Sequence, residues 1–579
     1  MSLSSAIYIA RSALTTSQIG IQVAGQNLAN IATPGYTRQL ASLSPIQTRA
    51  SGRFLIGQGV QVTGVRRQIN EAIQRRLWAS VSDESSKSTQ FDISSQVEGL
   101  LNELTGYDLS SELSGFFNSW SEIANLAGTP AGVVEQGDKL AGFIKSLRTD
   151  LGQLRRQVED DIDASVVRAN SLLDEIAGLN SEIQQFEGAG GTASSLRDQR
   201  DGLITELSGL LDVTTVEDPQ GNLDILVGST PIVLGGVSRG LDVKRVTDQS
   251  TGTVSVNVIV EQDGEPLDVR EGSIGGLLAT RNGAIDDTID RLNKLASQLI
   301  FHVNSVHATG RNASQLTSTL SNLRVGAPSR TMAINDPNND AFADLPFQAS
   351  NGSFYVEWTN KQTGATGRVQ IDVDLDGITN AGVPGTADDT TPEDIRAAID
   401  AIDGLNATWD AEGHLSITAD SGYEFSFADD SSNILGVMGV NSFFTGEDAG
   451  DIGIRQALLD DPTKVMLGRS VGGIFVENAN ALAMADLRDF PVQAFGGVGF
   501  QKFWLDHVQH VGTQTSGAQT QATSAAFVRE SLQAQRDSVS GVDADEESVN
   551  LIMFQQAYNG AAKLIQIANE MLGQLQELV

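Results

Sequence analysis

Both ends of the chain carry apolar residues at the spacing of a coiled coil. Near the N-terminus the steps alternate between four and three residues, at Leu3, Ile7, Ala10, Leu14, Ser17, Ile21, Ala24 and Leu28. Near the C-terminus the same alternation gives Leu551, Phe554, Tyr558, Ala561, Ile565, Ala568, Leu572, Leu575 and Val579. An apolar stripe is more often ordinary core than an assembly surface, but a seam of this period at a chain end needs a partner helix. We therefore predict that the two terminal helices pair with each other and then with neighbouring molecules.

The first seam ends in the stretch "GQNLANIATPGYTRQ", Gly25 to Gln39. Pro34 disfavours a helical conformation at Thr33, and Pro-Gly at the centre of Thr33-Pro34-Gly35-Tyr36 predicts a type II turn with Gly35 at positive φ. Asn30 is expected to end the helix in the left-handed conformation that asparagine tolerates. The turn would direct the chain into a strand-like or irregular segment, residues 40–65.

Composition restricts the possible functions. The chain has 579 residues, 40% of them apolar, so it should fold into three or four domains. It has no cysteine, which excludes disulfides and thiolate chemistry. The net charge of −35 argues against a nucleic-acid partner. We find no signal peptide and no apolar run long enough for a membrane span, and therefore expect no membrane insertion.

Charge is distributed unevenly along the chain. Residues 1–80 contain eight arginines and one acid, Glu71, whereas residues 541–579 contain six acids and one lysine, Lys563. The two ends are therefore electrostatically complementary, although chance and solvated helix faces explain such asymmetry about equally well.

Helical and strand-like patterns alternate between the two ends. Long helices are predicted over 133–187, 194–211, 285–306 and 500–537, and alternating strand patterns begin at Val213 and recur within 330–430. The predicted fold class is multidomain α+β, with a terminal coiled-coil helix pair, an elongated helical bundle and nested all-β outer domains. The predicted domains are a terminal coiled-coil domain (1–40 with 541–579), a helical bundle (41–212 with 273–311 and 485–540), a β insertion (213–272) and a variable β-rich outer domain (312–484).

Candidate chemistry is sparse. The stretch "DVDLDG" places Asp372, Asp374 and Asp376 like the start of a calcium loop, but position twelve is Val383 rather than glutamate, so a turn is the commoner explanation. The five histidines, at 302, 307, 414, 507 and 510, form no zinc-protease motif, and no phosphate-binding loop is present. We predict no catalytic residues, no metal and no cofactor; a serine or paired-carboxylate mechanism could not be located from the sequence.

Several motifs carry a family resemblance. "NLANIATPGY" resembles the N-terminal signature of bacterial flagellar axial proteins, and the following Thr37-Arg38-Gln39 resembles most the hook-associated family of the first hook–filament junction. The stretch "SGVDADEESVNLIMFQQAYNGAAKLIQIANEML", from Ser540 to Leu572, is similar to that family's C-terminal pattern. Residues 194–213 and 272–310 also fit the family, whereas 312–480 match nothing recognised.

The resemblance implies a structural protein that joins hook to filament and is not an enzyme. Its implied partners are further copies of itself in a tubular assembly, the hook protein, the second junction protein and thereby the filament, the flagellar type III export apparatus and a C-terminal export chaperone. Its implied location is the extracellular flagellum, after synthesis in the cytoplasm. The predicted assembly residues are Leu3, Ile7, Leu14, Ile21, Asn27, Leu28, Asn30, Thr33, Pro34, Gly35, Tyr36, Leu551, Phe554, Tyr558, Ile565, Leu572 and Leu575.

Two alternatives stay open at this point. Another axial protein, such as the hook protein or flagellin, would share the terminal seams, although the motifs after the turn and before the last helix disfavour it. An enzyme domain carried in the β region would be a different class of protein, with the remainder of the chain as scaffold.

Overall fold

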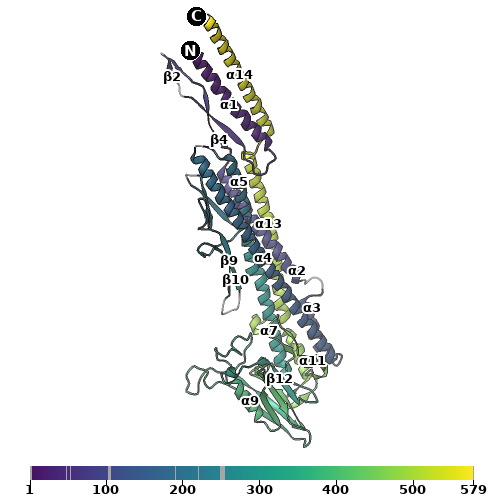
Figure 1. Cartoon of the computed structure of the whole chain (residues 1–579). Coiled ribbons are helices and arrows are strands. Elements are labelled where there is room, and N and C mark those ends of the chain that lie inside the picture. The colour runs from purple at the N-terminus through teal and green to yellow at the C-terminus, as the bar shows by residue number, and fades with distance from the viewer. Residues whose placement is uncertain are drawn as a thin grey trace. The chain divides into compact units, whose positions relative to one another are not determined.

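The structure is a computed structural model that describes residues 3–46, 49–51, 54–101, 106–189, 191–218, 221–247 and 254–577. Two compact units are built from segments that alternate along the chain. Unit 1 comprises Met1–Ser94, Gln157–Asn282 and Thr515–Val579, and unit 2 comprises Ser95–Arg156 and Gly283–Gln514. The predicted class, α+β with helices at both ends and antiparallel sheets between them, is confirmed (Figure 1). The four domain boundaries stay a prediction, and Val579 lies outside the described residues.

Unit 1 contains the two terminal helices and, among the residues that the structure describes, four small antiparallel sheets. Its elements are α1 (Leu3–Ala29), β1 (Gln39–Pro45), β2 (Arg49–Ser51), β3 (Phe54–Ile56), β4 (Val60–Arg67), most of α2 (Glu71–Leu101), the second part of α4 (Pro130–Gly188), α5 (Ser194–Leu210), β5 (Val213–Glu217), β6 (Leu223–Val227), β7 (Thr230–Leu234), β8 (Val237–Ser238), β9 (Leu241–Thr247), β10 (Val254–Val260), α6 (Gly272–Thr280), the second part of α13 (Phe500–Ser540) and α14 (Ala544–Glu577). Strand β1 pairs with β4 and β2 with β3, β5 to β8 form a four-stranded meander, and β9 pairs with β10.

Unit 2 consists of the remaining parts of α2, α4 and α13 together with further helices and small antiparallel sheets. Its other elements are α3 (Leu109–Ala124), α7 (Asp286–Ala308), β11 (Gly310–Arg311), β12 (Ser318–Arg324), α8 (Ala327–Arg330), β13 (Gly352–Asn360), β14 (Thr366–Val373), α9 (Pro392–Asp400), β15 (Leu405–Trp409), β16 (His414–Ala419), β17 (Tyr423–Ala428), α10 (Ile434–Met438), β18 (Phe444–Thr445), β19 (Gly453–Ile454), α11 (Gln456–Asp460), β20 (Gly468–Val471), β21 (Ile474–Val476) and α12 (Ala479–Asp486). The sheet orders are β11-β20-β21, β12-β16-β15, β14-β13-β17 and β18-β19.

The long helix predicted over 133–187 is confirmed as α4. Its predicted apolar face is buried throughout, at Leu147, Leu151, Leu154, Val158, Ile162, Val166, Ala169, Leu173, Ile176 and Ile183. The helix ends at Gly188, where the predicted glycine run begins. Periodicity succeeds here because every turn of the helix contributes a side chain to the core.

Unit 2 is held together by an aromatic cluster and an asparagine. Phe443 and Phe444 pack edge to face with ring centroids 5.0 Å apart, and Phe116 of α3 packs on both rings. Asn304 of α7 accepts from the backbone N–H of Phe443 and of Phe444, at 2.9 Å each, and donates to the Phe444 carbonyl at 3.0 Å. The polar backbone of this buried segment is thereby satisfied.

His307 of α7 lies at the centre of this core and is fully buried. Its Nδ1 is 2.7 Å from the carbonyl oxygen of Asn441, and its Nε2 is 3.2 Å from the backbone nitrogen of Met466. A neutral ring satisfies both contacts if Nδ1 carries the proton, donating to the carbonyl, and Nε2 accepts. Burial lowers the pKa of His307 to about 4.

A pair of neighbouring valines tests the packing of α4. Val166 is 4% exposed and Val167 is 70% exposed on the same helix. We expect Val166→Ala to lower the free energy of unfolding by about 2 kcal/mol, because two buried methyl groups are lost and a cavity is left. Val167→Ala should change it by less than about 0.5 kcal/mol. Urea unfolding followed by circular dichroism measures both, and equal effects would contradict the assigned face.

The buried His307 predicts acid sensitivity of unit 2. Because its folded pKa is about 4 and its unfolded pKa about 6.5, the unfolded state binds the proton more readily between these values. This contribution to stability is present above pH ~6.5 and falls by about 2 kcal/mol by pH 5. We expect His307→Gln, which keeps one donor and one acceptor, to reduce the pH dependence of the unfolding midpoint between pH 7 and 5 by roughly a third. The remainder comes from His302 and His507, because burial lowers the pKa of each to about 4 as well. The exposed His510 supplies the control, since His510→Gln should keep the wild-type dependence.

Candidate assembly surface at the paired termini

The terminal helices α1 and α14 pack side by side within unit 1, and both chain ends lie at the same end of this pair (Figure 1). Asn27 on α1 contacts Glu547 on α14, and seven residues earlier on α1, Gly20 faces Phe554, seven residues later on α14. The helices therefore run antiparallel. The sequence-based prediction that the two terminal helices pair is confirmed.

Small and large seam residues have different environments in this pair. The small ones are buried, with Ala10, Ser17, Ala24, Ala561 and Ala568 each at most 5% exposed. The large ones are covered incompletely, since Leu3, Ile7, Leu14, Ile21, Leu28, Leu551, Phe554 and Ile565 are half-buried and Tyr558 and Leu572 are more than a third exposed. Leu575 lies in α14. The pair therefore brings two backbones close together without covering its larger apolar side chains.

A second apolar stripe runs along α14. Its members are Val549, Met553, Leu564, Ile567 and Met571, which are between 46% and 65% exposed. At the rotation of an α-helix these side chains fall within about 60° of one another, roughly a third of a turn away from the seam that faces α1. Exposed apolar residues that line up in this way mark an interaction surface more often than isolated ones do.

The predicted turn follows α1. Gly35 has φ +78°, and the Tyr36 N–H donates to the Thr33 carbonyl at 3.2 Å, as a type II turn requires. The prediction for Asn30 is wrong, because Asn30 is not among the described residues with positive φ. Its side-chain Nδ2 instead donates to the Gln26 carbonyl at 2.9 Å, and its Oδ1 accepts from the Thr33 hydroxyl. A side-chain hydrogen bond thus satisfies the end of the helix without a left-handed residue.

Asn27 joins three segments through one buried amide. Its Oδ1 accepts from the Tyr36 hydroxyl at 2.9 Å and from the Gln39 N–H at 3.0 Å. Its Nδ2 donates to the Gln39 carbonyl at 2.9 Å and to Oε2 of Glu547 at 3.1 Å. Burial and the charges of Asp198 and Glu547 raise the pKa of Tyr36 to about 12, so its hydroxyl stays protonated and donates. Helix α1, the turn, strand β1 and helix α14 therefore meet at this side chain.

Arg38 completes the link to the C-terminal segment. Its guanidinium contacts Glu546 at 2.6 Å and Glu547 at 2.7 Å. The backbone N–H of Arg38 donates to the Ser540 carbonyl at 2.9 Å. Burial lowers the pKa of Arg38, but the hydrogen bonds with Glu547 and Glu546 outweigh it and raise the pKa overall. The predicted charge complementarity of the two ends is realised here as a specific ion pair.

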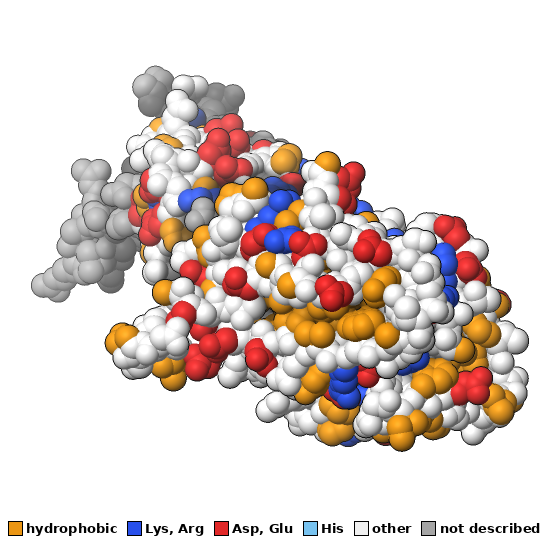
Figure 2. Space-filling model, turned by 90° about the horizontal axis from the view of Figure 1, so that it is seen from below, with side chains coloured by type: hydrophobic (Ala, Val, Ile, Leu, Met, Phe, Trp, Pro, Cys, Tyr) orange, Lys and Arg blue, Asp and Glu red, His pale blue; other side chains and the backbone are white. Residues whose placement is uncertain are grey.

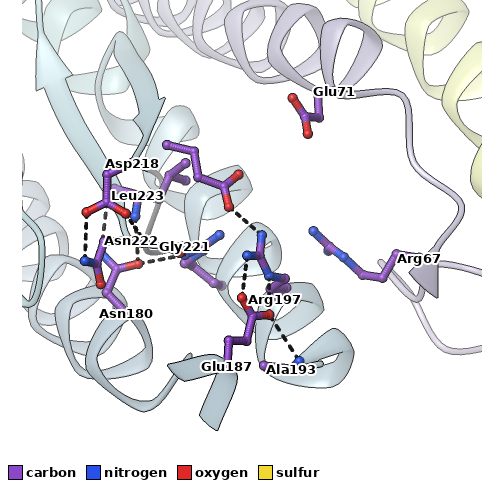
Figure 3. Close-up of polar contacts among 12 residues, drawn as sticks. Arg67, Glu71, Asn180, Glu187, Ala193, Arg197, Asp218, Gly221, Asn222 and Leu223 are labelled. Atoms are coloured by element: carbon purple, nitrogen blue, oxygen red, sulfur yellow. Dashed lines mark hydrogen bonds and ion pairs between the residues drawn. The ribbon is translucent and has the colours of Figure 1, made fainter. Parts of the chain in front are cut away.

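We call the contacts of Asn27, Tyr36, Arg38, Gln39 and Glu547 the terminal node. Helix α5 contacts the segments next to this node. Asp198 and Asp201 contact Arg67 of β4 at 2.8 and 2.6 Å, and Asp198 also accepts from the Thr37 N–H at 3.4 Å. Arg197 contacts Glu187 at 2.8 Å (Figure 3). It also contacts Glu217 at 2.6 Å. A cavity of about 410 Å³ lies beside these ion pairs. The charged residues of "SSLRDQRD" thus connect α5 to α4, β4 and β5.

Sequence reasoning selected part of this node and missed the rest. The predicted residues Asn27, Asn30, Thr33, Gly35 and Tyr36 lie together at the end of α1, and Pro34 is exposed in the turn. Residues outside the predicted set include Arg38, Arg67, Asp198, Asp201 and Glu547. The sequence did point to four of these five residues, because they lie inside the motifs that carry the family resemblance. A motif does not say, however, which of its charged residues form ion pairs with each other.

The remaining candidate residues lie elsewhere. His507 is buried, with its Nε2 3.0 Å from the Thr288 hydroxyl, and His510 is exposed. Asp374 and Asp376 follow strand β14 in unit 2. Within the described ranges, no helix combines the length and the apolar character that crossing a membrane requires.

Comparisons with known proteins match the same segments. The family described as flagellar hook-associated protein FlgK helical domain matches residues 94–319, the flagellar basal body rod FlgEFG protein C-terminal family matches 533–578, and the flagella basal body rod protein family matches 7–37. Flagellar hook-associated protein 1 of Salmonella typhimurium is 28% identical over 99% of both chains. The proteins of the same name are 26% identical in Escherichia coli, over 98% of both chains, and 22% in Bacillus subtilis, over 97% of this chain and 96% of that one. The solved structure of the flagellar hook junction protein FlgK from Burkholderia pseudomallei is 16% identical, with a TM-score of 0.47 over 80% of this chain and 99% of that chain.

The rod-type families match the ends of the chain at α1 and α14, which places the chain in the class of bacterial flagellar axial proteins. Full-length similarity and the helical-domain match narrow this assignment. The chain is similar over its full length to flagellar hook-associated protein 1 (FlgK), and its residues 94–319 match the helical domain of that protein.

The Asn27 node predicts how firmly the ends are held. Asn27→Ala leaves the Tyr36 hydroxyl, both backbone groups of Gln39 and the buried Glu547 without this partner. We expect hydrogen-exchange protection in α1 and α14 to fall about 100-fold, because several buried polar groups become unsatisfied. Asn30→Ala, which removes contacts at a more exposed position, should reduce protection by less than about tenfold. Equal losses would show that Asn27 has no special role.

Proposed function

We propose that the chain is a structural subunit of the bacterial flagellum that joins hook to filament and assembles through its paired terminal helices. The observation that carries this proposal is the apolar surface which the α1–α14 pair leaves uncovered, namely the large seam residues and the stripe Val549, Met553, Leu564, Ile567 and Met571. A surface of this kind is costly in water and becomes favourable when neighbouring copies cover it. The predicted assembly residues fall on this pair or on the turn beside it.

The energetics favour assembly of these ends over isolated stability. Burying apolar area contributes about 25 cal/mol per Å², so covering a stripe of five large side chains contributes several kcal/mol per subunit contact. The buried small residues let α1 and α14 approach closely, and the larger apolar side chains stay exposed to potential neighbours. We propose that residues 1–40 with 541–579 are the assembling domain. The helical bundle and the two β-rich domains are not part of it.

The proposed partners follow from the family and from the charge. They are further copies of the chain in a tubular assembly, the hook protein, and the second junction protein that connects to the filament. The flagellar export apparatus and a C-terminal export chaperone would handle the subunit before it reaches the extracellular flagellum. Nucleic acid is excluded from the proposal by the net charge of −35. On the face drawn in Figure 2, Lys and Arg side chains lie among Asp and Glu side chains without a continuous basic area.

We also propose that the chain works without catalysis. Its relatives are flagellar structural proteins. At the terminal node the polar groups are engaged in contacts that join segments of the chain, such as those of Asn27 and Arg38. Polar groups engaged in such contacts hold segments of the chain in place and are not available to act on a substrate.

The direct experiment is deletion of the gene in the source bacterium. We expect complete hooks without filaments, and flagellin released into the medium. Loss of the hooks as well would favour the hook-protein alternative, and normal filaments would contradict the proposal.

A single substitution on α14 tests the assembly surface itself. Leu564→Glu places a charge on the exposed stripe, and Gln555→Glu adds the same charge at an exposed polar position of the same helix. We expect Leu564→Glu to be exported and to fold, but to reduce swimming and filament number at least about tenfold, since a buried unpaired carboxylate opposes association. Gln555→Glu should restore both to near wild type. Full complementation by Leu564→Glu would show that the stripe is not an assembly surface.

A further inference from the structure

The loop after β14 brings acidic residues together from two separate positions in the chain. One carboxylate oxygen from each of Asp374, Asp376 and Asp389 lies within 4.8 Å of the others. The loop is closed at its base, where the Thr390 N–H donates to the Asp374 carbonyl and the Asp374 N–H donates to the Thr390 hydroxyl, both at 2.8 Å. The three carboxylates therefore occupy one position in unit 2, although Asp389 lies thirteen residues after Asp376.

Asp389 is the buried member of this cluster. It is only 3% exposed, and its Oδ2 accepts from Nδ2 of Asn335 at 2.6 Å and from the Gly377 N–H at 3.2 Å. Its other oxygen, Oδ1, is buried and has no hydrogen-bond partner within the described part of the chain. A buried carboxylate oxygen without a donor is unfavourable. The same side chain places a carboxylate oxygen within 4.8 Å of those of Asp374 and Asp376.

Basic side chains do not neutralise the cluster. Among the residues that the structure describes, no ion pair joins Lys, Arg or His to Asp374, Asp376, Asp388 or Asp389. Asp388 is adjacent, and its Oδ1 is also buried without a hydrogen-bond partner, while its Oδ2 accepts from the Asn380 N–H at 2.5 Å. Several negative charges thus converge where a positive charge would stabilise them.

We propose that this loop binds a calcium ion through Asp374, Asp376 and Asp389. All three donors are carboxylate oxygens, which hard cations prefer, and nitrogen or sulfur donors typical of zinc are absent from the cluster. Calcium–oxygen distances of about 2.3–2.6 Å place opposite ligands roughly 5 Å apart. Oxygens within 4.8 Å of one another can therefore reach one ion.

The loop also explains why the calcium pattern is incomplete in the sequence. The start "DVDLDG" has Val383 where a calcium loop of the usual length has its last acid. Asp389 supplies an acid from farther along the chain, and the positive φ of Gly377, +67°, turns the backbone so that its N–H meets Asp389. Asp372, the first acid of the motif, is exposed on β14, and its Oδ1 accepts from Gln370 at 2.6 Å. The ion would thereby fasten both ends of the loop.

Calorimetric titration of the full-length protein with calcium chloride, after removal of divalent ions with EDTA, tests the site. We expect one ion per chain with a dissociation constant between about 10 µM and 1 mM, and at least tenfold weaker binding of magnesium, which demands a tighter octahedral shell. The melting temperature should rise in calcium and return to its starting value in excess EDTA.

Two matched variants locate the ion. Asp376→Asn removes a ligand at an exposed position and should weaken calcium binding at least about tenfold, with an unchanged circular dichroism spectrum in EDTA. Asp372→Asn removes the same charge four residues away in the same motif and should stay within about twofold of wild type. The absence of binding up to about 10 mM calcium, far above the range of protein sites, would overturn the proposal. Equal losses in both variants would overturn the proposal too, because they would indicate that calcium is attracted non-specifically by the negative charge of the region.

Discussion

The buried amide of Asn27 is the contact on which the ends of this chain depend. Asparagine suits this position because its side chain offers both an acceptor and donors, and the segment after the turn presents both kinds of group at Gln39. The same Asn27 oxygen also accepts a hydrogen bond from the Tyr36 hydroxyl, and the same nitrogen also donates one to Glu547. Hydrophobic contacts alone would hold α1 against α14, but they would not determine where strand β1 leaves the pair.

Electrostatic contacts extend this arrangement into the body of unit 1. Arg38 directly precedes strand β1 and Arg67 is the last residue of β4. Each contacts two carboxylates that lie far away in the sequence. A partly buried guanidinium with two acidic partners is more strongly held than an exposed ion pair, because solvent and salt screen it less. The terminal pair and α5 are therefore connected through ion pairs and hydrogen bonds between specific side chains.

Sequence reasoning succeeded where the signal is local and repeated. The α4 face, the two seams and the Gly35 turn each follow from periodicity or from the backbone preferences of proline and glycine. It failed at Asn30, where a side-chain hydrogen bond to Gln26 competes with the left-handed conformation and satisfies the same helix end. It did not foresee the pairing of Arg38 with Glu547, or the approach of Asp389 to Asp376, because both join residues whose proximity depends on the whole fold. The exposed stripe of α14 was overlooked because the neighbouring seam has the more regular spacing.

The small residues between α1 and α14 make sliding of one helix along the other a real alternative. Ala10, Ser17 and Ala24 recur every seven residues, as do Ala561 and Ala568, so a shift of one heptad would again bring small residues together. Such a shift would separate Glu547, which is 2% exposed in the observed register, from both Asn27 and Arg38. One polar position thus selects a single register from several that packing alone would allow, much as a lone buried polar residue does in a coiled coil. The length by which each terminal helix extends past the other is consequently the same in every subunit, which a regular lattice of identical copies requires.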